Sequence, residues 1–123
     1  MKFYKKGEVI ITEGEPKGSI FILVEGSVGI YKNNIKISEF HQKGTVFGEM
    51  SLFLNKPRTA TIKATDDAYV AEINTDIDNL FKNHPDVAKK IIINLSERLM
   101  QLTDDYWHLT ERLDIEEKVR KYI

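Results

Sequence analysis

The stretch from residue 44 to residue 61 reads GTVFGEMSLFLNKPRTAT. Gly48 precedes a short apolar segment, Met50–Leu54, which is long enough for one or two helical turns. A helix that begins after a glycine leaves backbone N–H groups pointing outward, where they can bind an anion. Arg58 follows Pro57, and proline is tolerated at the start of a β-strand. Because a planar guanidinium donates parallel hydrogen bonds to phosphate, this stretch predicts a phosphate site between the helix start and the arginine.

A carboxylate, Glu49, lies beside this predicted anion site. Its presence is explained if the ligand carries a hydroxyl donor next to its phosphate, as a ribose does. The hydroxyls of Ser51 and Thr59 add small donors nearby. The alternative is a loop with a surface pair of Arg58 and Glu49 and no ligand. The residues themselves leave both interpretations open.

The residues on both sides of this stretch predict a β-domain. All seven glycines lie within residues 1–48, and glycine at this density marks tight turns between short strands. We expect strands at 9–12 and 20–24, a hairpin around the Asn33-Asn34 turn, and a second strand pair at 59–64 and 68–73. This pattern is typical of a mainly β sandwich or β-roll.

The last third of the chain predicts helices instead. Thr75 can cap a short helix in which Leu80 and Phe81 face inward, and Asn83-His84-Pro85 ends it. Pro85 suits the first turn of a second helix, which we expect to run to about Leu113. Apolar residues along this helix repeat at alternating spacings of three and four, which makes an a/d heptad seam. The seam consists of Ile92, Leu95, Leu99, Leu102, Tyr106, Leu109 and Leu113.

This heptad seam predicts a homodimer. At about 1.5 Å per residue, roughly 28 residues form a helix about 42 Å long. A domain of about 100 residues has a radius of gyration near 13 Å, so part of the seam needs another surface. A second copy of the same helix supplies that surface. The alternative is a long core helix lying across its own domain, which the polar residues on the opposite face disfavour: Glu97, Gln101, Asp104 and Glu111.

Two motifs carry a resemblance to a known family. FGEMSL at 47–52, followed by PRTAT at 57–61, resembles the phosphate-binding cassette of cyclic nucleotide-binding domains. KGEVI at 6–10, EGE at 13–15 and FILVEGSV at 21–28 are similar to the early strands of that family, so the resemblance covers most of residues 5–113. It implies a double-stranded β-helix, a jelly-roll-like β-roll, followed by a short helix and a long dimerisation helix.

The long heptad helix resembles, within that superfamily, the sensor half of bacterial catabolite activator (Crp/Fnr) transcription regulators. LDIEEKVR at 113–120 is similar to the hinge and first helix of their DNA-binding domain. The resemblance implies a cyclic nucleotide-binding β-roll with a short helix at 1–84, a dimerisation helix at 85–113, and a hinge with the start of a truncated DNA-binding domain at 114–123. DNA is then a partner only through a domain absent from this chain, which we expect to be cut from a longer regulator.

The resemblance also assigns ligand contacts. Arg58 and the backbone at Ser51 and Thr59 would hold the cyclic phosphate, and Glu49 would bind the ribose 2′-hydroxyl. Thr103 and Asp104 match positions that reach the purine, where an acceptor suits the adenine amino group. A guanine carbonyl would face Asp104 unfavourably, although Thr59 could serve a syn guanine. We therefore expect cAMP ahead of cGMP. The expected ligand-binding residues are Phe47, Gly48, Glu49, Met50, Ser51, Arg58, Thr59, Ala60, Thr103 and Asp104.

The composition argues against several other classes. The balance of 18 Lys+Arg against 19 Asp+Glu disfavours a nucleic-acid binder based on global charge and a polybasic membrane anchor. The chain has no cysteine and its three histidines are scattered, so we expect neither thiol chemistry nor a metal centre. Nothing resembles a catalytic triad or an acid–base pair. We therefore expect a cytoplasmic protein without enzyme activity, cofactor or membrane contact.

A dimerisation module on the same fold, with an empty pocket or a different effector, is the alternative to a cyclic nucleotide sensor. The pairing of Gly48-Glu49 with Arg58-Thr59 favours the sensor, because a disused pocket has no reason to keep a buried arginine opposite a glutamate. The cyclic nucleotide is expected as an effector and not as a cofactor.

Overall fold

The computed structural model describes residues 1–122 of the chain. These residues divide into two compact units. The first unit, Met1–Ile91, holds every described strand and two short helices. The second, from Ile92 onward, consists of the greater part of one long helix.

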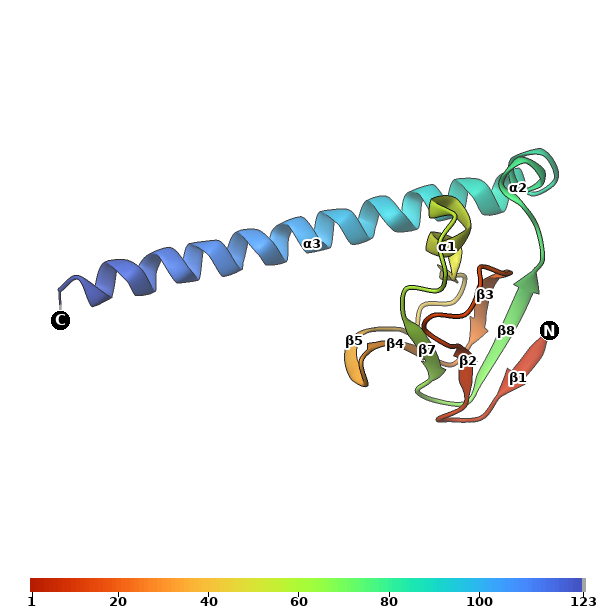
Figure 1. The fold of residues 1–123 in the computed structure, drawn as a ribbon, viewed down its shortest axis with the longest axis horizontal. Helices are drawn as coiled ribbons and strands as arrows, with labels where there is room; N and C mark the ends of the chain where they lie inside the picture. Colours follow the sequence, from red (N-terminus) through yellow and green to blue (C-terminus); the bar gives the residue numbers. More distant parts are fainter. Residues whose placement is uncertain (123) are drawn as a thin grey trace. The chain divides into compact units, whose positions relative to one another are not determined.

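The first unit is built from two four-stranded antiparallel sheets (Figure 1). One sheet has the order β1-β8-β3-β6, with bounds Lys2–Tyr4, Ala68–Ile73, Ile20–Glu25 and Val46–Phe47. The other has the order β2-β7-β4-β5, with bounds Val9–Ile11, Thr61–Ala64, Val28–Lys32 and Ile35–Phe40. The mainly β fold followed by a long C-terminal helix, predicted from the sequence, is confirmed.

The hydrophobic core lies between the two sheets. Leu23 and Phe47 come from the first sheet, whereas Val28 and Ile62 come from the second. Each of these side chains is at most 6% exposed. Alternation along every strand turns these residues inward, because successive side chains of a strand point to opposite faces.

The predicted hairpin around Asn33-Asn34 is confirmed. Strands β4 and β5 pair in antiparallel register from Val28 opposite Phe40 to Lys32 opposite Ile35. Both asparagines have positive φ, 50° and 65°. A two-residue turn with both central residues left-handed matches the twist of the flanking strands, and asparagine tolerates that conformation.

The predicted pairing of residues 59–64 with residues 68–73 is wrong. Strand β7 pairs with β2 and β4, whereas β8 pairs with β1 and β3 in the other sheet. Residues 65–67 therefore carry the chain from one sheet to the other. This crossing lets Ile62 and Val70 enter the same core from opposite sides, which a hairpin within one sheet would not do. Strand β1, which the sequence did not predict, is short and forms an edge of its sheet.

Two short helices interrupt or follow the strands. Helix α1 spans Glu49–Leu54, so it begins one residue before the segment Met50–Leu54 where one or two turns were predicted. Helix α2 spans Ile77–Asn83, and its N-cap is Asp76, not the predicted Thr75. The Asp76 carboxylate accepts the Asn79 N–H at 2.8 Å, a stronger charge-assisted cap than a threonine hydroxyl.

Only one of the two α2 side chains predicted to face inward does so. Leu80 is fully buried, but Phe81 is 48% exposed, so the prediction for Phe81 is wrong. Phe81 instead packs edge-on against Phe53 of α1, with ring centroids 6.4 Å apart. Adjacent positions on a helix are about 100° apart, so the burial of Leu80 turns Phe81 away from the core.

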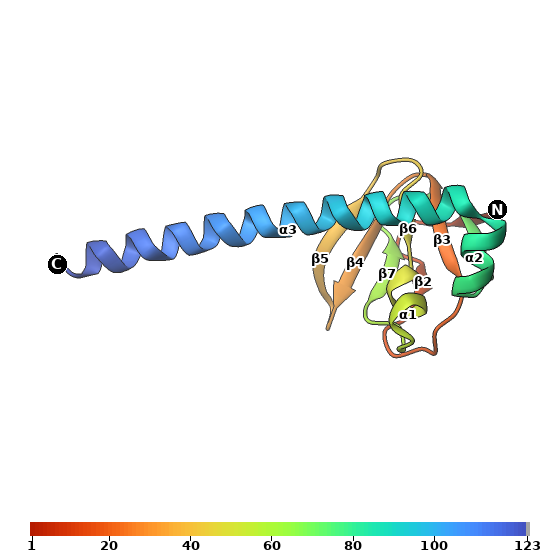
Figure 2. The ribbon, with the colours of Figure 1, turned by 90° about the horizontal axis from the view of Figure 1, so that it is seen from above.

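Helix α3, Pro85–Arg120, is unbroken and longer than predicted (Figure 2). It begins at Pro85 as expected, but the predicted end at Leu113 is wrong. No glycine or proline lies between residues 86 and 122. The Asp114 carboxylate lies 3.0 Å from Lys118 Nζ, an i,i+4 pair that supports a helix. The segment expected as a hinge is thus helical at its start, while its last residue, Ile123, lies outside the described residues.

The heptad seam is exposed along the second unit. Six of its seven residues are exposed, from Leu109 at 43% to Tyr106 at 70%, and Leu95 is half-buried. Polar residues also lie on the surface of this helix. Among residues 1–122 no helix has an apolar run that could cross a bilayer. The second unit therefore presents an exposed apolar stripe, and further apolar side chains outside the seam, such as Met100 and Trp107, are exposed as well.

The turn between β3 and β4 makes a backbone approach that can be tested. Gly26 has φ +92°, and a Cβ there would lie 2.1 Å from the Asp67 carbonyl oxygen and 2.8 Å from Ala68 Cα. Gly14 has φ +87° but nothing within 4 Å of such a Cβ. We expect Gly14→Ala to lower the free energy of unfolding by about 1 kcal/mol, the cost of the left-handed conformation alone. Gly26→Ala should lower it by about 3 kcal/mol or more, because the backbone must also move.

Urea denaturation of both variants measures these losses. Equal losses for Gly26→Ala and Gly14→Ala would contradict the close approach of the two turns.

Candidate functional site

Helix α1 and its flanking turns place Arg58. Gly48 precedes the helix with φ 81°, and Asn55 ends it with φ 52°, so both ends are left-handed. The Asn55 N–H donates to the Ser51 carbonyl, and Lys56 N–H bonds the same oxygen at 3.1 Å. This tight turn, followed by Pro57, brings the chain back toward the start of α1 at Arg58.

The guanidinium of Arg58 is buried and is held in one orientation by hydrogen bonds. Arg58 is 7% exposed. Its Nη1 donates to the Gly48 carbonyl at 2.8 Å and to Ser51 Oγ at 2.9 Å. Its Nη2 donates to the Ser19 carbonyl at 2.7 Å. Three bonds to three separate oxygens hold the planar group in one orientation.

The backbone of Arg58 is held as firmly as its side chain. Its N–H donates to the Glu15 carbonyl at 2.7 Å, and its carbonyl accepts the Gly14 N–H at 2.9 Å. The loop before β3 therefore binds Arg58 along both its main chain and, through Ser19, its side chain. A Cβ on Gly18 would lie 3.2 Å from Arg58 Nη2, and one on Gly48 would lie 3.1 Å from Nη1. Glycine at these two places lets the backbone approach the guanidinium.

Sequence reasoning did not predict Gly18 and Ser19 as part of this site. A signal was present, because two glycines and a proline stand between the first two predicted strands. Such a loop permits close approach of backbone to a ligand or to another side chain. What the sequence could not supply is that this loop faces α1, which depends on the order of the strands in the two sheets.

Acidic groups surround Arg58. Glu49, at the first position of α1, is 2% exposed. Burial lowers the pKa of the Arg58 guanidinium from its usual value, and the carboxylates of Glu15, Glu72 and Glu49 offset part of that effect. The Phe21 ring centroid lies 6.0 Å from Arg58 Cζ and provides an apolar wall. The site thus combines one buried cation with several carboxylates.

The structure brings some of the predicted ligand residues together and separates others. Gly48, Ser51 and Arg58 are in direct contact, and Glu49 lies within electrostatic reach of Arg58. Phe47 is instead a core residue, 1% exposed and stacked on Phe21 at 5.4 Å. The Met50 side chain is 45% exposed.

The strand side of the site carries Thr59 and Ala60, which are half-buried. The Thr59 carbonyl accepts Lys32 Nζ at 2.8 Å. Lys32 Nζ also lies 3.0 Å from Glu13 Oε1. A second cation therefore stands next to Thr59, but it is already paired with a carboxylate.

The predicted purine contacts lie on the second unit. Thr103 and Asp104 are exposed positions of α3. The Thr103 hydroxyl donates to the Leu99 carbonyl at 2.8 Å, so its proton is used within its own helix and its oxygen can still accept. Their contact with a ligand stays a prediction.

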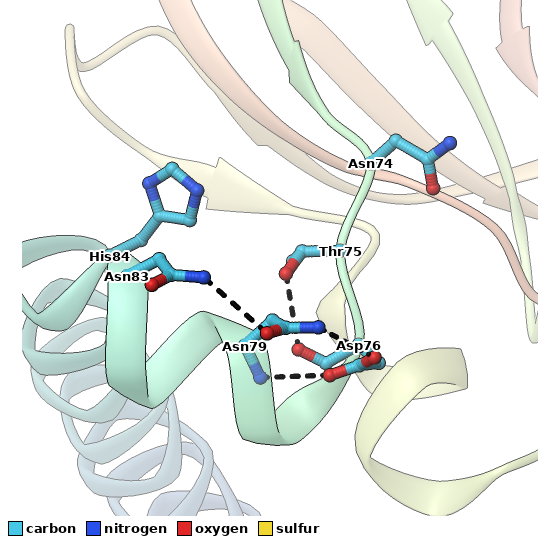
Figure 3. Close-up of a pocket in the computed structure, with 6 residues that line it drawn as sticks. All are labelled: Asn74, Thr75, Asp76, Asn79, Asn83 and His84. Carbon is cyan, nitrogen blue, oxygen red and sulfur yellow. Dashed lines mark hydrogen bonds between the residues drawn. The ribbon is translucent and has the colours of Figure 1, made fainter.

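A polar hollow beside α2 is a helix cap (Figure 3). Its lining groups bond one another: Asp76 accepts from both the backbone and the side chain of Asn79, at 2.8 and 2.9 Å. Asn83 in turn donates to Asn79. A ligand would have to break this capping network, and the hollow contains none of the residues around Arg58. Among residues 1–122 no group of three or more potential metal ligands comes together.

The comparisons with known proteins point to one family. The cAMP-dependent protein kinase regulatory subunit of Aspergillus niger is 35% identical over 74 residues. Those residues are 59% of this chain and 18% of the relative, so the chain matches less than a fifth of that relative's length. A solved structure described as PKAR CBD2 bound to Sp-2Cl-cAMPS is 36% identical, with a TM-score of 0.62. The match covers 82% of this chain and 69% of that one.

A transcription regulator shares the fold. CLP of Xanthomonas campestris, described as a c-di-GMP-responsive global regulator, has a TM-score of 0.71 over 84% of this chain and 55% of its own, at 24% identity. The family model for the cyclic nucleotide-binding domain matches residues 1–84, which hold both sheets, α1, α2 and all of the contacts of Arg58. The chain belongs to the cyclic nucleotide-binding domain family.

Proposed function

We propose that this chain is a sensor that binds a cyclic nucleotide and performs no chemistry on it. The observation that carries the proposal is the buried Arg58, fixed between Gly48, Ser51 and Ser19 with the carboxylate of Glu49 close by. A guanidinium offers up to five N–H donors, so the group that holds these protein oxygens can also reach a phosphate oxygen. Glu49, buried beside it, is placed to accept a ribose hydroxyl. Thr59 and the backbone at Ser51 complete the phosphate side.

The ligand proposed is cAMP in preference to cGMP. Asp104 and Thr103 offer acceptors for the adenine amino group, whereas a guanine carbonyl would face the Asp104 carboxylate unfavourably. The curated relative is named a cAMP-dependent kinase regulatory subunit, and the similar solved structure binds a cAMP analogue. Both support the adenine nucleotide.

The role proposed for the longer protein is a Crp/Fnr-type transcription regulator whose dimer helix passes ligand binding to a DNA-binding domain. It rests on the heptad seam of α3 and on the similarity of residues 113–120 to the hinge of those regulators. The second candidate is a kinase regulatory subunit, favoured by the 35% identity to such a subunit. A dimerisation module with another effector is the third, and ligand titration separates it from both.

The phosphate assignment is tested with Arg58→Ala. We expect it to weaken cAMP binding by about 2–5 kcal/mol, because it leaves the phosphate charge without its partner. Glu49→Ala should cost less, since it removes a hydrogen bond to a neutral hydroxyl. Isothermal titration with cAMP and cGMP gives the affinities. Arg112→Ala, an exposed arginine on α3, is the matched control and should bind as the wild type does.

Because Arg58 joins several segments, Arg58→Lys and circular dichroism accompany that experiment. The lysine keeps the charge but loses the planar fork, so a folded Arg58→Lys protein should still bind more weakly than the wild type. Equal affinity for cAMP in the wild type, Arg58→Ala and Arg58→Lys would refute the phosphate site.

A parallel homodimer through residues 92–113 is the second prediction. Its a positions are Ile92, Leu99, Tyr106 and Leu113, and leucine occupies every d position, which suits two strands. Leu99→Asp with Leu102→Asp should give monomers in sedimentation velocity. Gln101→Asp with His108→Asp adds the same charge off the seam and should remain dimeric. If the seam variant also remains dimeric, the interface lies elsewhere.

Coupling between ligand and helix is the third prediction. A ligand shifts a conformational equilibrium only by its differential affinity for the two states. We propose that purine contacts at Thr103 and Asp104 form only with the ordered helix, with a coupling of about 1–3 kcal/mol. Hydrogen exchange with and without cAMP should then show added protection at residues 100–113 as well as at 47–60. Protection confined to 47–60 would reduce the protein to a simple binding module.

A further inference from the structure

One of the carboxylates that act on Arg58, that of Glu72, is positioned by a serine. Ser19 sits between Arg58 and Glu72: its carbonyl accepts Arg58 Nη2 at 2.7 Å, and its hydroxyl donates to Glu72 Oε2 at 2.9 Å. Glu72 lies on β8 and is thereby held toward the site. The main chain of Glu15 is bound to that of Arg58, because the Glu15 carbonyl accepts the Arg58 N–H at 2.7 Å.

These groups leave the site with more negative than positive charge. The carboxylates of Glu15, Glu49 and Glu72 all act on the one guanidinium of Arg58. Lys2 Nζ lies 3.9 Å from Glu72 Oε1, but its side chain is 67% exposed, so this pair neutralises little. A single negative charge on a ligand can be matched by Arg58. A second negative charge would be repelled by the carboxylates of Glu72 and Glu15, which act on the same guanidinium.

This charge balance separates two classes of nucleotide. A phosphodiester, cyclic or not, carries one negative charge, whereas a phosphomonoester has a second pKa of about 6 and is close to doubly charged at pH 7.5. The two classes share the same base and sugar. A site that must respond to a cyclic diester in the presence of the ring-opened monoester can therefore separate them by charge alone.

We propose that Glu72, positioned by Ser19, together with Glu15, makes the site selective for singly charged phosphodiesters over doubly charged phosphomonoesters. This inference rests on the proposed function, because it concerns the same Arg58 site. Glu72 is a specificity-determining residue in this proposal. It acts on the ligand by its charge and does not replace Arg58 or Glu49 as a ligand contact.

Three adenine nucleotides separate charge from ring closure. They are cAMP, 5′-AMP and the methyl ester of 5′-AMP, an open-chain phosphodiester with one negative charge. The wild type should bind the methyl ester more tightly than 5′-AMP, although both lack the ring. The selectivity is the ratio of the Kd for 5′-AMP to the Kd for its methyl ester, and we call this ratio the gap. Glu72→Gln should lower it by about three- to ten-fold, the range expected when one nearby unit charge is removed in a partly solvated site. Glu15→Gln should narrow it in the same direction.

Two control variants test whether charge or local structure is responsible. Glu25→Gln removes one carboxylate from an exposed position at the end of β3 and should leave the gap unchanged. Ser19→Ala removes the hydrogen bond to Glu72 but keeps its charge, so most of the selectivity should remain. Raising the salt concentration should lower the affinity ratio between the methyl ester and 5′-AMP in the wild type, and should lower this ratio less in Glu72→Gln.

The outcomes separate this inference from the proposed function. Binding of cAMP by the wild type reports on the proposed function, and its absence overturns both. If cAMP binds but Glu72→Gln changes the affinity for all three nucleotides by one factor, the residue acts only through the structure of the loop and the charge proposal is wrong. An unchanged gap between 5′-AMP and its methyl ester in both Glu72→Gln and Glu15→Gln would overturn it as well.

Discussion

The buried guanidinium of Arg58 joins three segments that are far apart in the sequence. Its side chain bonds Ser19 before β3, Gly48 before α1 and Ser51 within α1, while its main chain bonds the loop at Gly14 and Glu15. Removing a cation from water costs several kcal/mol unless its donors are bonded. The loop, the helix and the segment before β7 must therefore be correctly placed for the charge to be tolerated, and the fold of this region depends on that condition.

The same condition prepares the site for an anion. Because the protein's own oxygens already hold the guanidinium, a phosphate meets an arginine whose orientation needs no further ordering, and preorganisation of this kind reduces the cost of binding. On the proposed function the structural and binding roles coincide in Arg58, while the carboxylates near it limit how much negative charge the site accepts.

The sequence was most informative where local chemistry decides the structure. Gly48, the turns of α1, Arg58 after proline and the Asn33-Asn34 hairpin follow from conformational rules for individual residues, and the structure contains all of them. Prediction from the sequence failed where contacts between distant segments decide the structure. Nothing local shows that β7 and β8 belong to different sheets, so neither that crossing nor the approach of Ser19 to Arg58 could be derived. Asp114 is a weak helix former, but α3 continues past it. The ion pair of Asp114 with Lys118 and the absence of glycine or proline outweigh its low helix propensity.

No glycine or proline interrupts helix α3 after Pro85. Ala88 and Ile91 belong to the first unit and are 3% and 1% exposed, whereas from Ile92 the apolar positions are exposed or half-buried. The helix passes from one environment to the other without glycine or proline. Sharp kinks in helices arise almost always at proline, at glycine or serine pairs, or at inserted groups. The seam from Ile92 to Leu113 therefore belongs to the same uninterrupted helix as the buried Ala88 and Ile91.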